Sequence, residues 1–457
     1  MTDGSSQALR DLDHVRRIVA ETCFPSEPSA PVPGRVGLEI EVFPVRVLAD
    51  GTPLERVPIE PLTDLIDHPP SLSRSGWLRE PYATPLFRIT GGGTLNFEPG
   101  GQLEHSTATH EDAAGALAEL DRVACTVESI LGREDVVLAG AGADVWLPNG
   151  HVPQQLRAPR YPAMAAYFDR RGPDGAVMMR RTCSLQVNLD LGTDGDLPER
   201  WLLANLAAPL LTASFACSPG PGLVSSRALT WQRLDPTRTG FPRLLVDGSG
   251  AGPTEQLTVA ALEADVLLLR NPEPPWEPGV PGWTFGDWLR DGHRLRSRPT
   301  EDDLRYHLTT MFLEVRPRGF MEQRSIDCLP ARLRQVPVVL LAGLVEDPHA
   351  RAAGRAVLER HQTALPELLR RSATVGLGDP LLGALAAEVW QLALEGAGRL
   401  PPGYLDGDGP RLAADFLDRY TLRRRCPADE LREALAAGPA AALAWASEPV
   451  PNQTLRL

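Results

Sequence analysis

Four segments of this chain carry carboxylate, amide or guanidinium side chains at every second position. These side chains are Glu39 and Glu41; Gln102 and Glu104, with Glu98 just before a Pro-Gly-Gly turn; Gln186, Asn188 and Asp190; and Glu322 and Arg324. Alternate side chains of a strand point to the same face of a sheet. For one strand, a polar face turned to water explains such a pattern, but carboxylates on neighbouring strands repel one another and need cations. Together, the four segments predict one shared site.

The chemistry available to this site is limited by the residue types present. Oxygen ligands without a Cys/His cluster suit Mg²⁺ or Mn²⁺ and argue against structural zinc. The chain contains no lysine, so all 46 basic residues are arginine. This excludes a Walker-type phosphate loop and a pyridoxal phosphate Schiff base, and leaves arginine, metal or backbone amides to hold phosphate. Carboxylates, Mg²⁺ and arginines suggest a nucleoside triphosphate and phosphoryl transfer.

The bulk properties indicate a globular protein that acts on small molecules. The chain has 457 residues, is 43% hydrophobic and carries a formal net charge of −13, which argues against nucleic acid or an anionic membrane surface as the main partner. Its longest weakly polar stretch, about 202–217, is too short to span a membrane and is expected to be a buried helix. The six cysteines are scattered and form no C-x-x-C pair, and the N-terminus has no secretory pattern. Both observations predict a cytoplasmic protein.

The elements that must position the site are predicted from periodicity and turn residues. A short helix within residues 1–22 and a Pro/Ser-rich linker precede a strand at 35–45, and TLNFEPGGQLEHS (94–106) reads as two short strands. Further strands are expected at 135–145, 181–192, 264–270 and 312–327, and helices at 111–132, 161–170 and from about 198. Residues 50–90 show no clear pattern, and the chain beyond Pro330 is mostly helical. Irregular alternation with hairpin signals predicts an α+β fold with antiparallel pairing.

Six segments in a fixed order also resemble a known family. They read GRVGLEIEVFPV, NFEPGGQLEHS, RYPAMAAYF, RTCSLQVNLDLG, SRALTWQRLDPTRTG and YHLTTMFLEVRPRGFMEQRSIDCLP, and they cover about residues 34–335. Together they resemble the glutamate–cysteine ligases of the plant and actinobacterial type, and most closely those that open ergothioneine biosynthesis. The resemblance implies a glutamine synthetase-like antiparallel β-sheet funnel flanked by helices. It places an N-terminal helix and linker at 1–33, the catalytic domain at 34–335 and a packed helical region at 336–457.

The resemblance also implies roles for individual residues. Five carboxylates match the family's metal ligands: Glu39, Glu41, Glu98, Glu104 and Glu322. Arg324 and Arg238 are implied to be catalytic: Arg324 is suited to a phosphate or the developing acyl phosphate, and Arg238 belongs to a segment that helps bind the amino-acid substrate or the phosphates. Substrate or ATP contacts are implied for Gln102, Gln186, Asn188, Arg227, Trp231, Arg316 and Arg318, with surface salt bridges as the alternative for the last two. The chain departs from the family's usual pattern at Glu104–Thr107, which reads E-H-S-T, and at Cys217 in place of an asparagine.

The implied activity is the ATP-dependent joining of glutamate to cysteine through a γ-glutamyl phosphate, with Mg²⁺ or Mn²⁺ as cofactor. The protein is expected to be a monomer or homodimer. One alternative is a related ligase that joins a different amine in natural-product biosynthesis. A second is a non-catalytic relative that binds glutamate or nucleotide, although five retained carboxylates argue against it because buried Glu is costly without metals. His105 is expected to be structural, and Tyr161, Met164 and Tyr167 are expected to pack in the core.

Overall fold

A central antiparallel sheet organises the protein, whose computed structural model describes residues 7–67, 77–80, 84–147, 152–271, 273–293 and 298–447. The strands follow the order β13-β14-β8-β1-β6-β5-β4-β3, and β2 and β7 pair with the far half of β1. Their bounds are β1 Val36–Val47, β2 Pro53–Arg56, β3 Leu78–Arg79, β4 Phe87–Arg88, β5 Thr94–Phe97, β6 Leu103–Ser106, β7 Val136–Ala139, β8 Ser184–Leu189, β13 Val315–Pro317 and β14 Met321–Asp327. Two small ladders join β9 (Thr239–Gly240) to β12 (Phe312–Leu313) and β10 (Leu268–Leu269) to β11 (Glu277–Pro278).

Helices surround this sheet. Those before residue 335 are α1 Leu12–Cys23, α2 Ile59–Asp67, α3 Ala113–Leu131, α4 Arg160–Asp169, α5 Asp174–Arg181, α6 Leu197–Ser214, α7 Ser226–Leu234, α8 Arg243–Val246, α9 Pro253–Glu263, α10 Phe285–Asp291 and α11 Glu301–Thr309. The later ones are α12 Gln335–Glu346, α13 Pro348–Leu358, α14 Leu365–Thr374, α15 Pro380–Ala397, α16 Gly409–Arg419, α17 Pro427–Ala437 and α18 Pro439–Ser447. Short 3₁₀ turns lie at Gly132–Glu134, Glu359–Ala364, Gly376–Gly378 and Thr421–Arg423.

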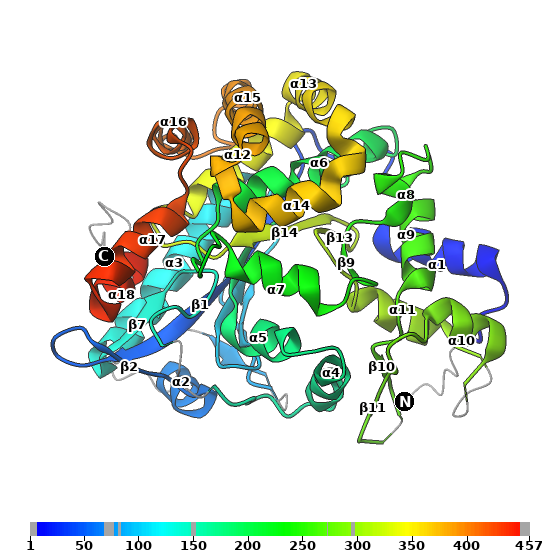
Figure 1. Ribbon diagram of the computed structural model, residues 1–457, viewed down its shortest axis with the longest axis horizontal. Coiled ribbons are helices and arrows are strands. Elements are labelled where there is room, and N and C mark those ends of the chain that lie inside the picture. Colours follow the sequence, from blue (N-terminus) through cyan, green and yellow to red (C-terminus); the bar gives the residue numbers. More distant parts are fainter. Residues whose placement is uncertain are drawn as a thin grey trace.

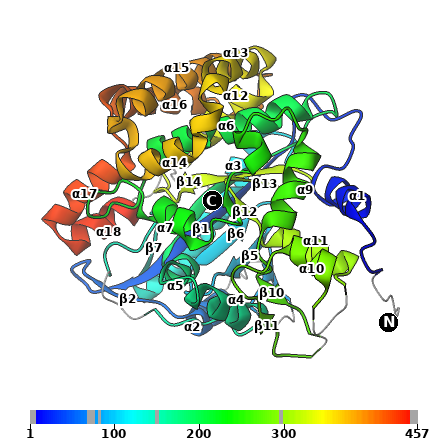
Figure 2. The ribbon, with the colours of Figure 1, turned by 45° about the vertical axis from the view of Figure 1, so that its right-hand side comes forward.

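One continuous hydrophobic core joins the sheet to the C-terminal helices. It includes Leu185 and Val187 of β8 as well as Leu341 of α12 and Trp390 of α15. Helix α6 lies between these layers and is buried on nearly every side from Trp201 onward, as its mostly apolar composition predicts. Figures 1 and 2 show α12, α13, α15 and α16 on one side of the molecule, with α4 and α5 on the opposite side.

The predicted antiparallel α+β fold is confirmed, and several predicted elements keep their places. The strand at 35–45, the pair within 94–106, the helix at 111–132 and the buried helix from about 198 all appear. Among the helices that the structure describes, none is long and apolar enough to cross a lipid bilayer. The boundaries proposed at 33/34 and 335/336 stay predictions.

Three predicted strands are clearly wrong in extent, and within 135–145 only β7 (Val136–Ala139) is a strand. Within 264–270 only β10 is a strand. The rest of the segment is apolar because it is buried and not because it belongs to the main sheet, since Val266 donates its backbone N–H to the Trp283 carbonyl. The segment 312–327 is three strands, since a turn at Arg318 and Gly319 folds β13 back on β14. Gly319 has a φ of 77°, a conformation that costs glycine little.

Candidate active site

Polar side chains from neighbouring strands meet in rows across one face of the sheet. On β1, Glu41 lies opposite Glu104 of β6, and Glu104 in turn lies opposite Asn96 of β5. Glu39 lies opposite Gln186 of β8. The antiparallel register therefore brings the predicted segments together, as their alternating pattern implied. Figure 2 shows β1, β6 and β5 side by side near the centre of the molecule.

These rows form the floor of a cavity of about 260 Å³, which we call the reaction cavity. It contains most of the predicted site residues, together with residues of α4, α5 and α7. The lining residues are Glu39, Glu41, Asn96, Glu98, Pro99, Gln102, Glu104, Arg160, Tyr161, Met164, Met178, Met179, Thr182, Gln186, Trp231, Phe312, Arg316, Arg318 and Arg324.

Three carboxylates on this floor are close enough to share a metal ion. One ligand oxygen from each of Glu39, Glu41 and Glu104 lies within 4.8 Å of the other two. Burial and repulsion from neighbouring carboxylates raise the pKa of Glu39 and Glu98, and the same causes raise the pKa of Glu41 to about 7. Buried carboxylates that repel one another are stable as anions only beside cations. The all-oxygen donor set fits Mg²⁺ or Mn²⁺.

Hydrogen bonds orient two of the floor carboxylates. The Ser184 backbone N–H donates to Glu41 Oε2 at 2.8 Å. Gln186 donates from its amide nitrogen to Glu39 and accepts at Oε1 from Arg324 Nη1 at 3.0 Å. Gln186 therefore connects the carboxylate floor to the arginine beside it.

A tight turn carries Glu98 into the cavity. The turn closes through hydrogen bonds between Glu98 and Gln102 and between Gly101 and Glu98, and Gly101 has a φ of 83°. Gln102 lines the cavity, but its amide is used in local hydrogen bonds. Its Oε1 accepts from the Gly100 N–H at 3.0 Å, and its Nε2 donates to the Thr182 carbonyl at 3.0 Å. Its predicted substrate contact stays a prediction.

Glu322 lies beside the floor but is surrounded by arginines. Arg316 bonds both carboxylate oxygens, with Nη2 at 2.9 Å from Oε1, and Arg324 Nη1 lies 3.3 Å from the same oxygen. Burial would raise the pKa of Glu322, yet the guanidinium groups outweigh burial and lower this pKa to about 2. The structure therefore separates Glu322 from the group of three carboxylates, and its role as a metal ligand stays a prediction.

Arg227 and Trp231 of α7 lie beside Arg324. Trp231 lines the reaction cavity, and the guanidinium carbons of Arg324 and Arg227 lie 5.3 and 5.9 Å from its ring centroid. Arg227 is oriented by Asp327 of β14, 3.5 Å away, and by the carbonyl of Arg324 at 2.9 Å. Attraction between a cation and an aromatic face adds to this ordering.

Arg238 is not among the residues that line the reaction cavity, and its predicted catalytic role stays a prediction. Its side chain is fully buried, and all three nitrogen positions donate hydrogen bonds. Nε bonds Asp235 Oδ2 at 2.8 Å, Nη1 bonds the Thr310 carbonyl at 2.9 Å, and Nη2 bonds the Asp265 carbonyl. With Nη1 also bonding Thr310 Oγ1, four of the five N–H donors of this buried guanidinium hold the local fold together.

Four other predicted polar positions also lie outside the cavity lining: Glu322, Arg227, Asn188 and Asp190. Asn188 faces Glu322 across the β8–β14 ladder, and its buried Oδ1 has no hydrogen-bond partner in the described chain. Asp190, on the same strand face, accepts from Arg35 Nε at 2.9 Å and is therefore held by an ion pair.

Several cavity residues were not predicted from the sequence. Extending the alternation one step back from Glu98 would have found Asn96. Arg160 carries no such signal, although its buried Nε has no hydrogen-bond partner among the described residues. Tyr161 and Met164 were predicted to pack in the core but also line the cavity, whereas Tyr167 is fully buried as expected.

Within the two departures from the family pattern, Glu104 lines the reaction cavity, whereas His105, Ser106, Thr107 and Cys217 do not. Thr107 Oγ1 accepts from the Leu38 N–H at 2.9 Å and so connects the segment after β6 to β1. Cys217 is fully buried, and its backbone N–H donates to Asp327 Oδ2 at 2.8 Å. Neither side chain replaces a cavity residue.

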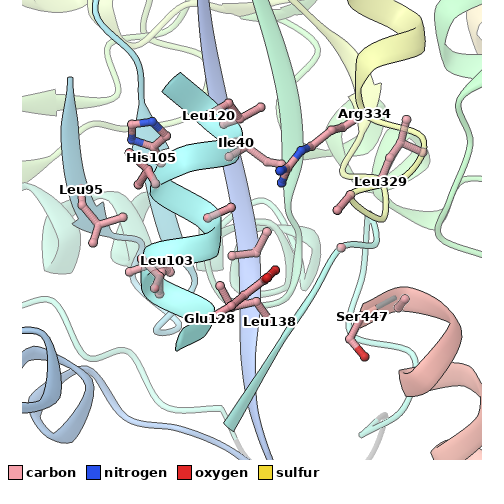
Figure 3. A pocket seen from close by; sticks show the side chains of 17 residues that line it. Ile40, Leu95, Leu103, His105, Leu120, Glu128, Leu138, Leu329, Arg334 and Ser447 are labelled. Atoms are coloured by element: carbon pink, nitrogen blue, oxygen red, sulfur yellow. The ribbon is translucent and has the colours of Figure 1, made fainter. Parts of the chain in front are cut away.

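A second cavity lies on the opposite face of the sheet and contains no carboxylate cluster. It measures about 40 Å³ and is mostly apolar, with walls that include Ile40, Leu103 and Leu120 (Figure 3). His105 is at its edge, 3.1 Å from the Thr94 carbonyl, which agrees with the expected structural role. This face therefore belongs largely to the hydrophobic core.

The raised carboxylate pKa values predict how pH affects metal-free protein. Because Glu39, Glu41 and Glu98 bind protons more tightly when folded than when unfolded, the free energy of unfolding falls as pH rises from about 4.5 through 7. Mg²⁺ should offset this loss, so the increase in Tm on adding Mg²⁺ should grow between about pH 5 and pH 8. Thermal unfolding at each pH, with chelator and with Mg²⁺, measures this increase in Tm. An increase in Tm that is the same across this range would contradict the assignment.

An antiparallel sheet with carboxylates on one face and arginines beside them is an arrangement suited to a ligase that transfers a phosphoryl group. The profile of glutamate–cysteine ligase family 2 (GCS2) matches residues 35–395, and this chain belongs to that family.

Individual relatives agree with this membership. The chain is 33% identical to a glutamate–cysteine ligase EgtA of Mycolicibacterium smegmatis over 88% of each protein. It is 30% identical to a chloroplastic glutamate–cysteine ligase of Medicago truncatula, over 67% of this chain and 62% of the relative. The crystal structure of a Francisella tularensis glutamate–cysteine ligase in complex with AMP superposes with a TM-score of 0.50, covering 93% of this chain and 91% of that one at 14% identity. That last similarity supports the fold alone.

Proposed function

We propose that this protein is an ATP-dependent ligase that joins the γ-carboxylate of L-glutamate to the amine of L-cysteine. The observation that carries the proposal is the convergence of Glu39, Glu41 and Glu104 beside Arg324 in a chain of this family. Acid activation by ATP needs cations around a transferring phosphoryl group, and this cavity has both metal ligands and guanidinium groups.

The proposed reaction has two steps. An oxygen of the glutamate γ-carboxylate attacks the terminal phosphorus of ATP, which breaks the bond to ADP and forms an acyl phosphate. The neutral amine of cysteine then attacks the acyl carbon, and phosphate leaves with the original carboxylate oxygen. The amine gives up one proton as the amide forms. The sum is one amide, one ADP and one phosphate per cycle.

Each part of the cavity has a proposed share in this chemistry. Glu39, Glu41 and Glu104 would hold Mg²⁺ or Mn²⁺, with Glu98 beside them and Glu322 as the fifth carboxylate. When bound, the ions would neutralise charge on the phosphates and the reacting carboxylate.

Guanidinium groups on the other wall are proposed to stabilise the phosphoryl group. Arg324 and Arg316 form ion pairs with Glu322, and all four arginines (Arg160, Arg316, Arg318 and Arg324) line the reaction cavity. A planar guanidinium bonds two phosphate oxygens at once, which makes arginine suited to this role in a chain without lysine.

The cellular setting is proposed from the same features. All six cysteines are free thiols, and ATP and amino acids are metabolites of the cytoplasm, where we place the protein. The motif resemblance to ligases that open ergothioneine biosynthesis supports assigning its product to that first step. Monomer and homodimer both remain proposals.

Substrate preference tests the proposed function. Glutamate should be preferred to aspartate, because a carboxylate one methylene shorter cannot reach the same point from a fixed α-carboxylate anchor. Cysteine should be a better amine than alanine or serine. Steady-state ADP release with each pair measures both preferences. An unrelated amine that exceeds cysteine by about tenfold in kcat/KM would instead support a related ligase of natural-product biosynthesis.

A further inference from the structure

A small polar pocket adjoins the reaction cavity behind Trp231. Its volume is about 20 Å³, enough for one group the size of a water molecule or an ammonium. Trp231, Phe312 and Arg324 line both this pocket and the reaction cavity, so the two spaces share a wall. The other lining residues are Thr212, Arg227, Ala228, Leu313, Glu314 and Ser325.

Glu314 is the one carboxylate that lines this pocket, and it is incompletely satisfied. Ser325 Oγ donates to Glu314 Oε2 at 2.6 Å. Within the ranges that the structure describes, no donor bonds Oε1 and no arginine forms an ion pair with Glu314. The nearby guanidinium groups are oriented elsewhere, Arg227 toward Asp327 and Arg324 toward Glu322. Glu314 is only partly buried, so its Oε1 is open to a ligand group, and a cationic donor is the partner that a carboxylate oxygen binds most strongly.

The pocket therefore presents an anion between two cations. Arg324 uses only Nη1 in its side-chain hydrogen bonds, to Gln186 and Glu322, so its other nitrogens have no acceptor among the described residues. A guanidinium suits a carboxylate, and a carboxylate suits an ammonium. Together these groups match the two charges of an α-amino acid.

Of the two amino acids in the proposed reaction, glutamate fits this pair of charges better. The amine of cysteine must be neutral to attack the acyl phosphate, so a fixed anion beside it would hold it in the unreactive ammonium form. The α-ammonium of glutamate takes no part in the chemistry and stays charged throughout. It can therefore remain paired with an anion during the whole cycle.

Resting on the proposed function, we propose that Glu314 binds the α-ammonium of glutamate and thereby selects an α-amino acid as the acid substrate. Arg227 lines the same pocket and would meet the α-carboxylate of the same molecule, which leaves Arg324 for the phosphoryl group. Because the pocket shares a wall with the reaction cavity, this anchor leaves the side chain of glutamate directed toward the carboxylate floor.

The test compares glutamate with glutarate, which lacks the α-amino group. Glu314→Gln should raise the KM for glutamate about tenfold or more, since a hydrogen bond to a charged group is lost. The KM values for ATP and cysteine should stay within about twofold. The inhibition constant of glutarate, measured in competition with glutamate, should not change because glutarate has no ammonium to bind.

Controls separate binding from folding. Glu128→Gln makes the same substitution at the cavity on the opposite sheet face and should leave every KM unchanged. If Glu314→Gln does not fold, Ser325→Ala removes only the donor that orients Glu314, and it should raise the glutamate KM while sparing glutarate.

Three results would overturn the inference. Equal weakening of glutamate and glutarate would mean that Glu314 acts only by supporting the arginines. A raised KM for cysteine alone would place the wrong substrate here, and an unchanged KM for glutamate would leave Glu314 without this role. If calorimetry shows no glutamate binding to the wild-type protein with ATP analogue and Mg²⁺, the proposed function fails as well, so the two failures are distinguishable.

Discussion

Replacing Glu41 by glutamine should lower kcat by about 10²-fold or more while leaving the protein folded. Glu41 lies at the centre of the floor, opposite Glu104, and one of its oxygens is already oriented by the Ser184 N–H. A neutral amide in its place offers a weaker ligand and removes one negative charge from the metal site. Removal of Mg²⁺ by a chelator should abolish turnover in the wild-type protein.

Stability distinguishes this loss from unfolding. Because neighbouring carboxylates raise the pKa of Glu41, removing its charge relieves repulsion in the metal-free protein. The metal-free Tm of Glu41→Gln should therefore equal or exceed that of the wild type, and its increase on adding Mg²⁺ should shrink. Glu128→Gln is the matched control and should keep normal kcat. Wild-type turnover by Glu41→Gln at saturating Mg²⁺ would remove this cluster from the mechanism.

The second large effect is expected at Arg324. Its guanidinium bonds Gln186 of β8 and Glu322 of β14 and lies over Trp231 of α7, so it connects three elements that surround the cavity. A cation placed there stabilises negative charge that develops as the phosphoryl group transfers. Arg324→Ala should therefore lower kcat by about 10²-fold or more, far beyond any effect on stability. Arg324→Lys should restore activity only in part, because an ammonium cannot bond two oxygens in one plane.

The measurement pairs thermal unfolding with ADP release on the same preparations. Arg334→Ala is the contrasting control, since Arg334 is also buried and ion-paired, to Asp121, but lies at the cavity on the opposite face. That variant should lose stability and keep its kcat. If Arg324→Ala unfolds the protein, Arg324 is structural, and if it keeps full turnover, this strand has no part in catalysis.

The carboxylate floor was predictable because it depends on a local rule. Alternation along each strand placed Glu39 with Glu41 and Gln102 with Glu104 before any pairing was known. The repulsion among these groups then required cations, which pointed to a metal site. The register Glu41–Glu104 confirms that neighbouring strands bring the carboxylates together.

Other features depend on residues distant in sequence, so local patterns could not reveal them. Arg238 matched a family segment, yet its donors are satisfied by Thr310 and by the carbonyl of Asp265, which only the folded chain brings near. The apolar run before β10 looked like a strand because burial and sheet pairing favour similar residues. Arg160 enters the cavity through the packing of α4, which no spacing rule describes.

The most direct test of the proposed reaction follows the oxygen that activation transfers. Glutamate labelled with a heavy oxygen isotope in its γ-carboxylate is incubated with ATP, cysteine, Mg²⁺ and the protein, and the products are analysed by mass spectrometry. The account predicts γ-glutamylcysteine, ADP and phosphate that carries one labelled oxygen in each turnover. Label in AMP, or product formed with unlabelled phosphate, would contradict activation of glutamate as an acyl phosphate.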